Sequence, residues 1–258
     1  MSTVDVVRHR DARSLADSVA ARVITRLVER LADTGSAHLC LTGGGIGTAV
    51  LAAIAASPSC DAVDWPRVDV WWGDERYLPE GYADRNETGA RAALLNHVPV
   101  RPERVHAIPG PWGSHSDVDQ AAAAYAQALA AAARPEDHGP APAMDILLLG
   151  IGPDAHVASL FAGQPALHDD RPCVAVRGAP KPPPVRVTLT LATINAAREV
   201  WILASGAEKA GAVRLALSEG AGPFQVPAAG ARGQDRTLFL LDEAAAAKLP
   251  ATLGRPGA

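Results

Sequence analysis

The sequence predicts an α/β protein, in which an open and mainly parallel sheet carries helices on both faces. Short apolar runs alternate with longer amphipathic segments, as expected when each strand is followed by a crossover helix. Apolar residues make up 48% of the 258 residues, enough for a substantial core. Neither a clear linker nor an internal repeat divides the chain, so a single domain over residues 1–258 is expected.

The first quarter of the chain predicts two strands, each followed by a helix. Val4–Arg8 is a short run of β-forming residues. After Asp11, a suitable helix N-cap, apolar residues recur at every fourth position to about Asp33, which predicts a helix with one buried face. A buried strand is expected at His38–Leu41, and a helix at Thr48–Ala56 follows the glycines after that strand.

The next segments continue the alternation. The apolar run at Val68–Trp72 predicts a buried strand, and Asn86–His97 has the pattern of a helix. A short strand is expected at Arg104–Ile108. Ser116 or Asp117 is placed to cap the alanine-rich helix that follows.

The second half of the chain supplies the remaining strands. Met144–Leu149 is expected to be a central strand, and Pro165–Pro184 is expected to be mostly loop. The further predicted elements are strands at Cys173–Arg177, Val185–Leu191 and Glu199–Ala204, a helix after Gly206 through Leu217, a last strand at Thr237–Leu241 and a short terminal helix.

Composition and charge argue against several classes of protein. The formal net charge is −4 and there is no long basic run, so nucleic acid is not an expected partner. Three widely spaced cysteines fit neither a disulfide framework nor a zinc knuckle. The N-terminal segment MSTVDVVRHRDARSL has no apolar signal core, and no window reaches the ~18 apolar residues that span a bilayer. We therefore expect a soluble cytoplasmic protein.

The most informative segment is Leu147–Gly163, which reads LLLGIGPDAHVASLFAG. An apolar run ends in glycines, Asp154 and His156 follow, and a short apolar pattern then predicts the start of a helix. This arrangement places titratable side chains in the crevice at the carboxyl end of a sheet, where open α/β folds bind ligands. His156 can accept a proton near neutral pH, and Asp154 can fix its tautomer. Considered alone, the pair is equally well explained as a surface histidine beside a helix-capping aspartate.

Two further segments follow predicted strands. The glycines of Thr42–Gly47 let backbone N–H groups approach an anion at a helix N-terminus, although the spacing matches neither a Walker A loop nor the dinucleotide fingerprint. Gly73–Arg76 carries three charges directly after an apolar run, and such charges must be paired, solvated or used. The alternative for Thr42–Gly47 is a plain tight turn, and the alternative for Gly73–Arg76 is an ion-paired loop.

Positive charge appears late in the chain. Arg186 opens a predicted strand, and its planar guanidinium suits a phosphate. Lys209 lies in the first turn of a predicted helix, a position that is unfavourable for a cation unless an anion is bound there. For each residue alone, a solvated cation is the alternative.

Taken together, these segments resemble the glucosamine-6-phosphate isomerase/6-phosphogluconolactonase family. The matching motifs occur in the same order and at similar distances, from Val4 to Leu249: LTGGG, WWGDERYLP followed by Asp84-Arg85-Asn86, GIGPDAHVASLFAG, PPVRVTLT and SGAEKA. The GDER motif and the segment around His156 are the specific parts of the resemblance, and the glycine and cation segments are weaker.

The resemblance implies the fold of sugar-phosphate isomerases and deaminases, which is Rossmann-like in layout but binds no nucleotide. It implies hydrolysis of 6-phospho-D-glucono-1,5-lactone to 6-phospho-D-gluconate, the second step of the oxidative pentose phosphate pathway. Neither a cofactor nor a metal is expected, the partner is a small sugar-phosphate lactone, and the protein is expected to be a monomer or a weak homo-oligomer. A glucosamine-6-phosphate deaminase/isomerase and a catalytically inactive sugar-phosphate-binding module are the alternatives.

The resemblance also implies roles for individual residues. His156 is the expected base for water attack, oriented by Asp154, and Asp74 is grouped with them as catalytic. Arg76, or backbone N–H groups near Gly152, would stabilise the charge on the carbonyl oxygen. The residues expected to hold the phosphate are Gly43, Gly44, Gly45, Arg186 and Lys209.

Three positions depart from the family pattern. Ala155 stands before the motif histidine where the family usually has glycine, a change that is tolerable only if the residue keeps a negative φ. Ala162 replaces a frequent proline, and Arg85 replaces a frequent serine. These changes affect loop geometry and remove no titratable group.

Overall fold

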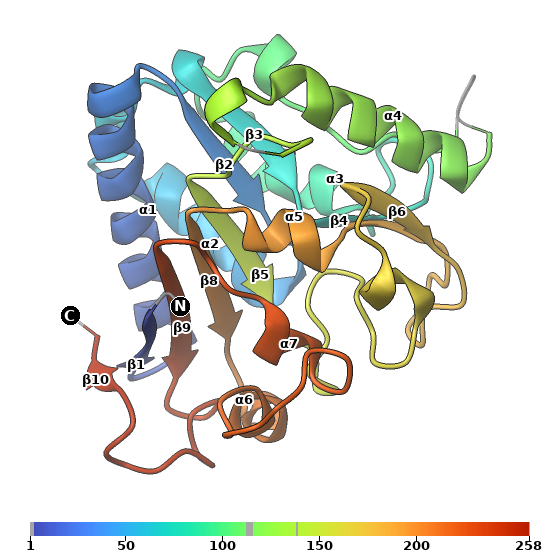
Figure 1. Cartoon of the computed structure of the whole chain (residues 1–258). Coiled ribbons are helices and arrows are strands. Elements are labelled where there is room, and N and C mark those ends of the chain that lie inside the picture. Colours follow the sequence, from blue (N-terminus) through green and yellow to red (C-terminus); the bar gives the residue numbers. More distant parts are fainter. Residues whose placement is uncertain (1–2, 112–115, 138, 258) are drawn as a thin grey trace.

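The computed structural model describes residues 3–111, 116–137 and 139–257 (Figure 1). Within these residues the main sheet has seven strands in the order β10-β1-β9-β8-β5-β2-β3. Every strand pair in it is parallel, which confirms the predicted mainly parallel sheet. The strands are β1 (Thr3–His9), β2 (Ala37–Leu41), β3 (Val68–Trp72), β5 (Ile146–Gly150), β8 (Glu199–Ala204), β9 (Arg236–Asp242) and β10 (Arg255–Pro256).

A second, antiparallel sheet has the order β4-β7-β6. It consists of β4 (Asp74–Arg76), β7 (Arg186–Leu189) and β6 (Cys173–Val176). The three charges after β3 therefore form a strand, where the sequence favoured an ion-paired loop. Side chains alternate along a strand and residues opposite each other share a face. Because Arg76 pairs with Arg186, these two side chains lie on the same face as Asp74, whereas Glu75 faces the other way.

Helices cover both faces of the main sheet. The helices are α1 (Ala12–Thr34), α2 (Gly44–Ala56), α3 (Asn86–Ala90), α4 (Val118–Ala132), α5 (Leu191–Asn195), α6 (Ala210–Ala216) and α7 (Pro227–Gly230). α1 packs against α2, which lies behind the sheet in Figure 1, whereas α5 and α7 lie in front of it. α4 packs on β6 and β7.

The predicted helix caps are present. The Asp11 carboxylate accepts a hydrogen bond from Ser14 N at 2.8 Å and begins α1. Asp117, rather than Ser116, caps α4, and Gln120 completes a capping box. These polar side chains satisfy N–H groups that would otherwise lack partners at the helix ends.

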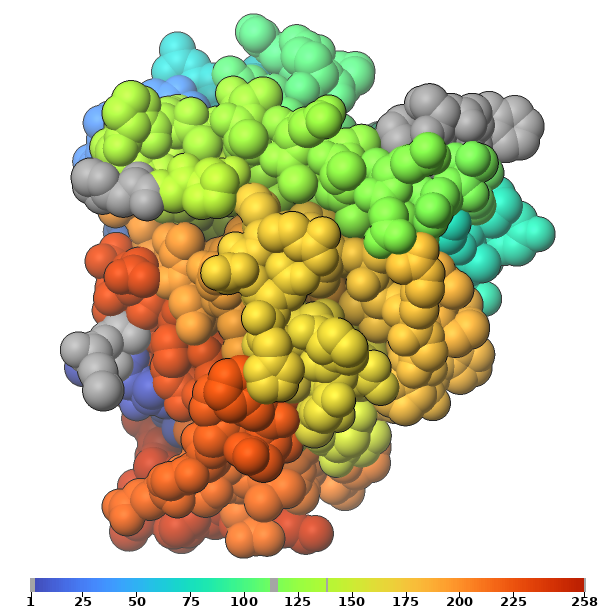
Figure 2. Space-filling model, turned by 45° about the vertical axis from the view of Figure 1, so that its right-hand side comes forward, coloured from blue at the N-terminus to red at the C-terminus, as the bar shows by residue number. Residues whose placement is uncertain are grey.

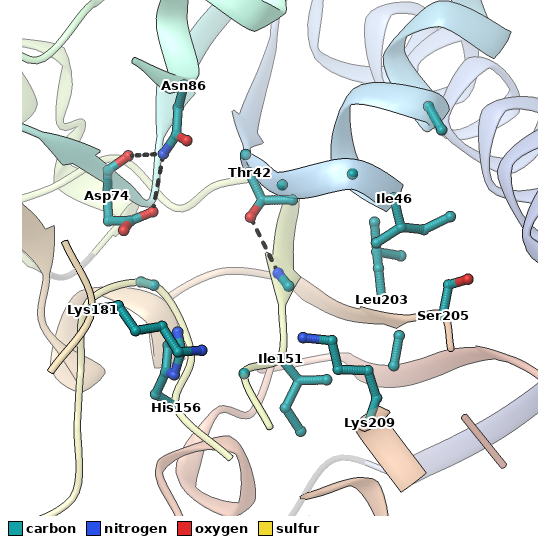
Figure 3. Close-up of a pocket in the computed structure, with 18 of the residues that line it drawn as sticks. Thr42, Ile46, Asp74, Asn86, Ile151, His156, Lys181, Leu203, Ser205 and Lys209 are labelled. Carbon is teal, nitrogen blue, oxygen red and sulfur yellow. Dashed lines mark hydrogen bonds between the residues drawn. The ribbon is translucent and has the colours of Figure 1, made fainter. Parts of the chain in front are cut away.

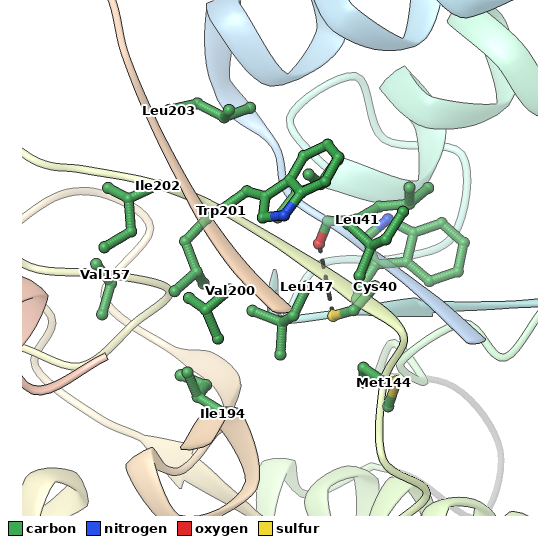
Figure 4. Packing of buried hydrophobic residues seen from close by; sticks show 14 of the residues in the cluster. Cys40, Leu41, Met144, Leu147, Val157, Ile194, Val200, Trp201, Ile202 and Leu203 are labelled. Carbon is green, nitrogen blue, oxygen red and sulfur yellow. Dashed lines mark hydrogen bonds between the residues drawn. The ribbon is translucent and has the colours of Figure 1, made fainter. Parts of the chain in front are cut away.

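The core lies around the central strands. Figure 4 shows Cys40 of β2, Leu147 of β5 and Val200 of β8 packed side by side, with Ile194 of α5 next to them. All four side chains are buried. Strands covered on both faces read as continuous apolar runs, which is why their positions could be predicted closely.

A buried polar cluster lies at the amino-terminal edge of this core. Asp145, just before β5, accepts hydrogen bonds from His38 N at 2.8 Å and Arg30 Nε at 2.7 Å. Trp71 Nε1 donates to His38 Nδ1 at 3.2 Å. The cluster joins α1, β2, β3 and β5 at the edge opposite the candidate site described below.

Three predicted elements are wrong. Arg104–Ile108 is not a strand, because its only ladder contact is the bridge between Val105 and Val70, and Pro109 follows directly. The expected helix after His156 is absent, because Ala155 and Ala158 adopt positive φ and turn the chain back on itself. The expected terminal helix is a short series of turns beginning at Glu243, and the chain then reaches β10.

Two predicted helices differ in form. Asn86–His97 divides into α3 and a π-helical turn at Arg91–Leu95. The helix after Gly206 begins with a 3₁₀ turn at Ala207–Lys209 and continues as α6.

Two long loops meet on the surface in front of the sheet. In Figure 2 the yellow segment that contains residues 165–168 adjoins the orange segment before α7. The His168 and Phe224 rings stack there with centroids 4.5 Å apart. Deeper in the same region, Ala228 N donates to Ala155 O at 3.0 Å, so α7 supports the loop that carries His156.

Candidate active site

A cavity of about 590 Å³ opens at the carboxyl end of β2, β5 and β8 (Figure 3). This is the edge at which parallel α/β sheets usually bind ligands. Nearly all of the site residues predicted from the sequence line it: Gly43, Gly44, Gly45, Asp74, Arg76, Gly152, His156, Arg186 and Lys209. Asp154 is the exception, because it contacts the cavity through His156.

His156 and Asp154 form a hydrogen-bonded pair. His156 Nδ1 lies 2.5 Å from Asp154 Oδ1. An ionised carboxylate can only accept, so this contact places the imidazole proton on Nδ1. His156 Nε2 has no hydrogen-bond partner within the described chain and is the nitrogen left for a water molecule. The pair thus has the geometry of a base oriented by a carboxylate.

The surroundings keep His156 neutral. Burial lowers the pKa of the imidazole, and the nearby Lys181 ammonium lowers it further, while the Asp154 carboxylate opposes both. Burial works against ionisation of Asp154, but the hydrogen bond and charge of His156 lower the pKa of that carboxyl overall. At neutral pH the pair is therefore a neutral imidazole beside a carboxylate, which is the form that can accept a proton.

Gly152 makes room for this pair. A Cβ at this position would lie 2.0 Å from His156 Nδ1 and 2.5 Å from Asp154 Oδ1. The Gly152 N–H donates to His156 O at 2.9 Å. This N–H is therefore committed within the loop and is not available to an oxyanion, contrary to the role suggested by the sequence.

Ala155 differs from expectation. Its φ is +61°, in the left-handed region, whereas a negative φ was expected. The residue is buried, and the turn from Gly152 to His156 requires the left-handed conformation. A side chain with a Cβ is strained there, so the glycine usual at this position in the family is the residue that fits without strain.

β4 supplies the wall opposite Lys209. Asn86 Nδ2 donates to Asp74 O at 2.8 Å and to Asp74 Oδ1 at 3.3 Å, and Arg76 Nη1 donates to Asn86 Oδ1. Ser159 Oγ donates to Asp74 Oδ2 at 2.6 Å. Asp74 is thus held on both sides, and the Arg76 guanidinium is fixed beside it.

Arg186 is committed largely to one loop. Its Nε donates to Pro183 O at 3.1 Å, and its Nη2 donates to Lys181 O at 3.0 Å and Pro182 O at 3.4 Å. Its guanidinium carbon lies 5.8 Å from the centroid of the Phe161 ring, on which His156 also packs. Its Nη1 donates to Ser159 Oγ at 3.4 Å and lies 3.9 Å from Asp74 Oδ2. All three guanidinium nitrogens therefore have partners in the protein, and Arg186 offers an anion mainly its charge.

The other cationic elements remain open to a ligand. α2 begins in the glycine loop, so its first N–H groups face the cavity. Lys209 lies at the start of α6, and burial followed by repulsion from Lys181 lowers the pKa of its ammonium. The carboxylates of Glu208 and Asp154 offset this repulsion only in part, because the pKa of Lys209 stays lowered. Two neighbouring cations in one cavity favour an anionic ligand.

Sequence reasoning missed three residues that line or support the cavity. Lys181 lies beside His156 (Figure 3), with Nζ 3.8 Å from Asp154 Oδ1. Asn86 was part of the motif Asp84-Arg85-Asn86 but received no role in the site, and Ser159 was given none either. The GAPKPPP loop directly before Arg186 was the available signal for Lys181, because a loop that precedes a site strand lies near the site.

The described residues were compared with the requirements of a metal site and of a membrane-spanning helix. They contain no group of three or more His, Cys, Asp or Glu side chains arranged to hold a metal ion. In the same part of the chain, no helix has the length and apolar character needed to cross a bilayer.

Known proteins resemble this chain over nearly its full length. A family model described as glucosamine-6-phosphate isomerases/6-phosphogluconolactonase matches residues 10–240. The chain is 56% identical over 258 residues to the 6-phosphogluconolactonase of Streptomyces coelicolor, covering 98% of each chain. It is 48% identical over 242 residues to the 6-phosphogluconolactonase of Mycobacterium tuberculosis, covering 93% of this chain and 96% of that protein. The solved 6-phosphogluconolactonase from Trypanosoma brucei matches with a TM-score of 0.80 at 26% identity, over 97% of this chain and 100% of that one. The chain belongs to the glucosamine-6-phosphate isomerase/6-phosphogluconolactonase family.

Proposed function

We propose that this protein hydrolyses 6-phospho-D-glucono-1,5-lactone to 6-phospho-D-gluconate. The observation that carries the proposal is a single cavity that joins the His156–Asp154 pair to Lys209 and the N-terminus of α2. The base at one side of the cavity can activate water for attack on a ring ester, and the positive charge at the other side can bind a phosphate. The relatives at 56% and 48% identity are both 6-phosphogluconolactonases, which favours this reaction over deamination of an amino sugar.

His156 acts as the general base. Its Nε2 takes a proton from a water molecule as the water oxygen attacks C1 of the lactone. Asp154 holds the Nδ1 tautomer and stabilises the imidazolium that forms. A δ-lactone is already an activated ester, so no covalent enzyme intermediate is needed.

Arg76 is the side chain best placed to stabilise the oxyanion. Charge develops on the carbonyl oxygen in the tetrahedral intermediate, and a fixed guanidinium stabilises it without reorganisation. When the bond between C1 and the ring oxygen breaks, His156 returns its proton to that oxygen. The products are a carboxyl group at C1 and a free hydroxyl at C5.

The phosphate end fixes the lactone in place. Lys209 and the N–H groups at Gly43–Gly45 bind the 6-phosphate, and Arg186 adds its charge. Remote binding of this kind orients the reacting carbonyl, and it distinguishes the phosphorylated lactone from the free sugar lactone.

The test generates the lactone in situ from glucose 6-phosphate and follows its disappearance against spontaneous opening. Replacing His156 by Ala should reduce kcat by about 10²–10⁴-fold, while binding of 6-phosphogluconate is retained. Wild-type turnover in His156→Ala would remove His156 as the base. Release of ammonia from glucosamine 6-phosphate, with no effect on the lactone, would instead establish the deaminase.

A further inference from the structure

We propose that Glu75 and Arg85, which lie outside the cavity, form a positioning unit for the catalytic wall made by Arg76 and Asn86. The proposal rests on the lactonase function above and extends it to residues that never contact the substrate. Their arrangement fixes the main chain of both wall residues from behind.

The alternation of β4 separates two roles. Asp74 and Arg76 point into the cavity, and Glu75 points to the opposite side, where its side chain is 1% exposed. A carboxylate buried this completely needs hydrogen-bond donors or a counter-charge. Glu75 has both.

The Glu75 carboxylate binds the start of α3. Its Oε1 accepts from Arg76 N at 2.8 Å and Asn86 N at 2.7 Å, and its Oε2 accepts from Glu87 N at 2.8 Å. One carboxylate thus ties the last residue of β4 to the first two residues of α3. Two of these three N–H groups belong to residues whose side chains line the cavity.

Arg85 holds this unit in the surrounding structure. Its side chain is fully buried, and its Nε lies 3.9 Å from Glu75 Oε2. Its Nη1 donates to Leu78 O at 2.9 Å, and its Nη2 donates to Ile108 O at 2.7 Å and Glu87 Oε2 at 2.9 Å. Three separate segments therefore converge on one guanidinium beside the carboxylate.

A displacement here reaches the reacting groups directly. The Asn86 amide donates to Asp74 and accepts from Arg76, so movement of its main chain shifts both charged side chains. A misplacement of about 1 Å at a catalytic group can cost on the order of 10²-fold in rate. Affinity for the phosphate end should change less than kcat, because Lys209 lies on another element. Asn86 packs against this end only at Gly43, the N-cap of α2.

The experiment compares two buried carboxylates. Glu75→Gln keeps the shape but presents an amide donor to the N–H groups or to Arg85. Asp145→Asn is the matched control, because Asp145 is also buried and binds a main-chain N–H and an arginine, at the amino-terminal edge of the sheet. For both variants we would measure kcat, KM, the melting temperature and the binding of 6-phosphogluconate.

A positioning role of Glu75 predicts that Glu75→Gln and Asp145→Asn differ in kcat. Both should melt at lower temperature, but only Glu75→Gln should lose at least about tenfold in kcat, with KM and product affinity within about threefold of wild type. Folded Glu75→Gln with the kcat of Asp145→Asn would overturn the proposal. Wild-type protein that opens the lactone no faster than buffer would instead overturn the proposed function, and the positioning role with it.

Arg85 provides a second series in case Glu75→Gln does not fold. Arg85→Lys keeps a positive charge beside Glu75 but cannot reach both carbonyls, and Arg85→Met removes the charge. We expect kcat to fall in the order wild type, Arg85→Lys, Arg85→Met at similar KM. Equal kcat in all three folded proteins would contradict the proposal.

Discussion

Burial, followed by two opposing charges, determines the protonation of His156. Lys181 disfavours the imidazolium and Asp154 favours it, on a background in which burial already lowers the pKa. The base must be neutral to act, so kcat/KM should fall on the acid side of the pKa of the free enzyme. Because that pKa lies below the usual 6.5, more than half of the maximal kcat/KM should remain at pH 6.5.

Removing the Lys181 charge tests this balance. In Lys181→Met the repulsion disappears, the pKa of His156 rises, and the acid limb of the kcat/KM profile should move to higher pH. Lys248→Met removes the same charge elsewhere and should leave the limb in place. An acid limb that is unchanged, or that moves to lower pH, in Lys181→Met would refute the assignment.

Gly152 offers a steric test of the same pair. The added methyl of Gly152→Ala would overlap His156 Nδ1 and Asp154 Oδ1, so the ring must turn away from its partner. We expect a loss of kcat of about 10²-fold or more. In Gly211→Ala the added methyl meets only Lys248 Nζ at 3.9 Å, so kcat should be retained. Full activity in Gly152→Ala would show that the close contact of His156 with Asp154 is dispensable.

At the scale of residues, the sequence was informative where a motif is local. Asp154 and His156 are two positions apart, so their contact follows from a single tight turn. Lys181 could not be found in this way, because its place beside His156 depends on hydrogen bonds from Arg186 to the carbonyl groups of its loop. Contacts of this kind are set by tertiary structure and leave no periodic pattern.

Among the elements, the turn after β5 stores backbone strain. Ala155 and Ala158 both have positive φ, at +61° and +48°. Left-handed backbone costs an alanine about 1 kcal/mol relative to glycine. This strained turn stands where the apolar pattern of the segment predicted a helix.

Ala158→Gly should therefore stabilise the protein. The residue is only partly buried, so little packing is lost, and relief of the strain should add about 0.5–1 kcal/mol, or about 1–4 °C in Tm. Ala52→Gly, at an exposed helical position of α2, should lower stability by about 0.5–1 kcal/mol. The opposite signs can be measured by thermal unfolding. A decrease of similar size in both variants would show that the turn is not strained.

The central strands of the main sheet were predictable because their burial on both faces leaves an apolar run, whereas β10, with two exposed residues, was not predicted. The same reasoning failed for β4, because three successive charges resemble a loop. Their strand conformation depends on pairing with β7, which lies far along the chain and cannot be read from local sequence. Helix ends were predictable where a side-chain cap was present, as at Asp11 and Asp117.

For the molecule as a whole, buried imidazoles couple stability to pH. Burial is the largest cause of a lowered pKa at His9, His38 and His156. Below the unfolded value of about 6.5 the unfolded chain binds protons that the folded chain does not. The contribution of these histidines to the free energy of unfolding is therefore complete above pH 6.5. It decreases as the pH falls from 6.5 to the pKa values of the folded protein, where it is lost.

The prediction is a Tm that decreases from pH 7.5 to pH 5.5, above the range in which carboxyl groups of ordinary pKa titrate. Each histidine contributes at most about 1.4 kcal/mol per pH unit. His38→Gln keeps an acceptor for Trp71 Nε1 but cannot titrate, so its Tm should depend less steeply on pH. A dependence as steep as that of wild type would exclude His38 as a contributor.

The hydrogen bonds from Arg186 to the loop before it have a consequence for sequence variation in that loop. In this loop the guanidinium donates only to main-chain oxygens of residues 181–183, so these hydrogen bonds do not depend on the side chain at position 181. A substitution at position 181 can therefore change the charge beside Asp154 while these hydrogen bonds are kept. The charge at this edge of the cavity can thus vary independently of the contacts that anchor the loop.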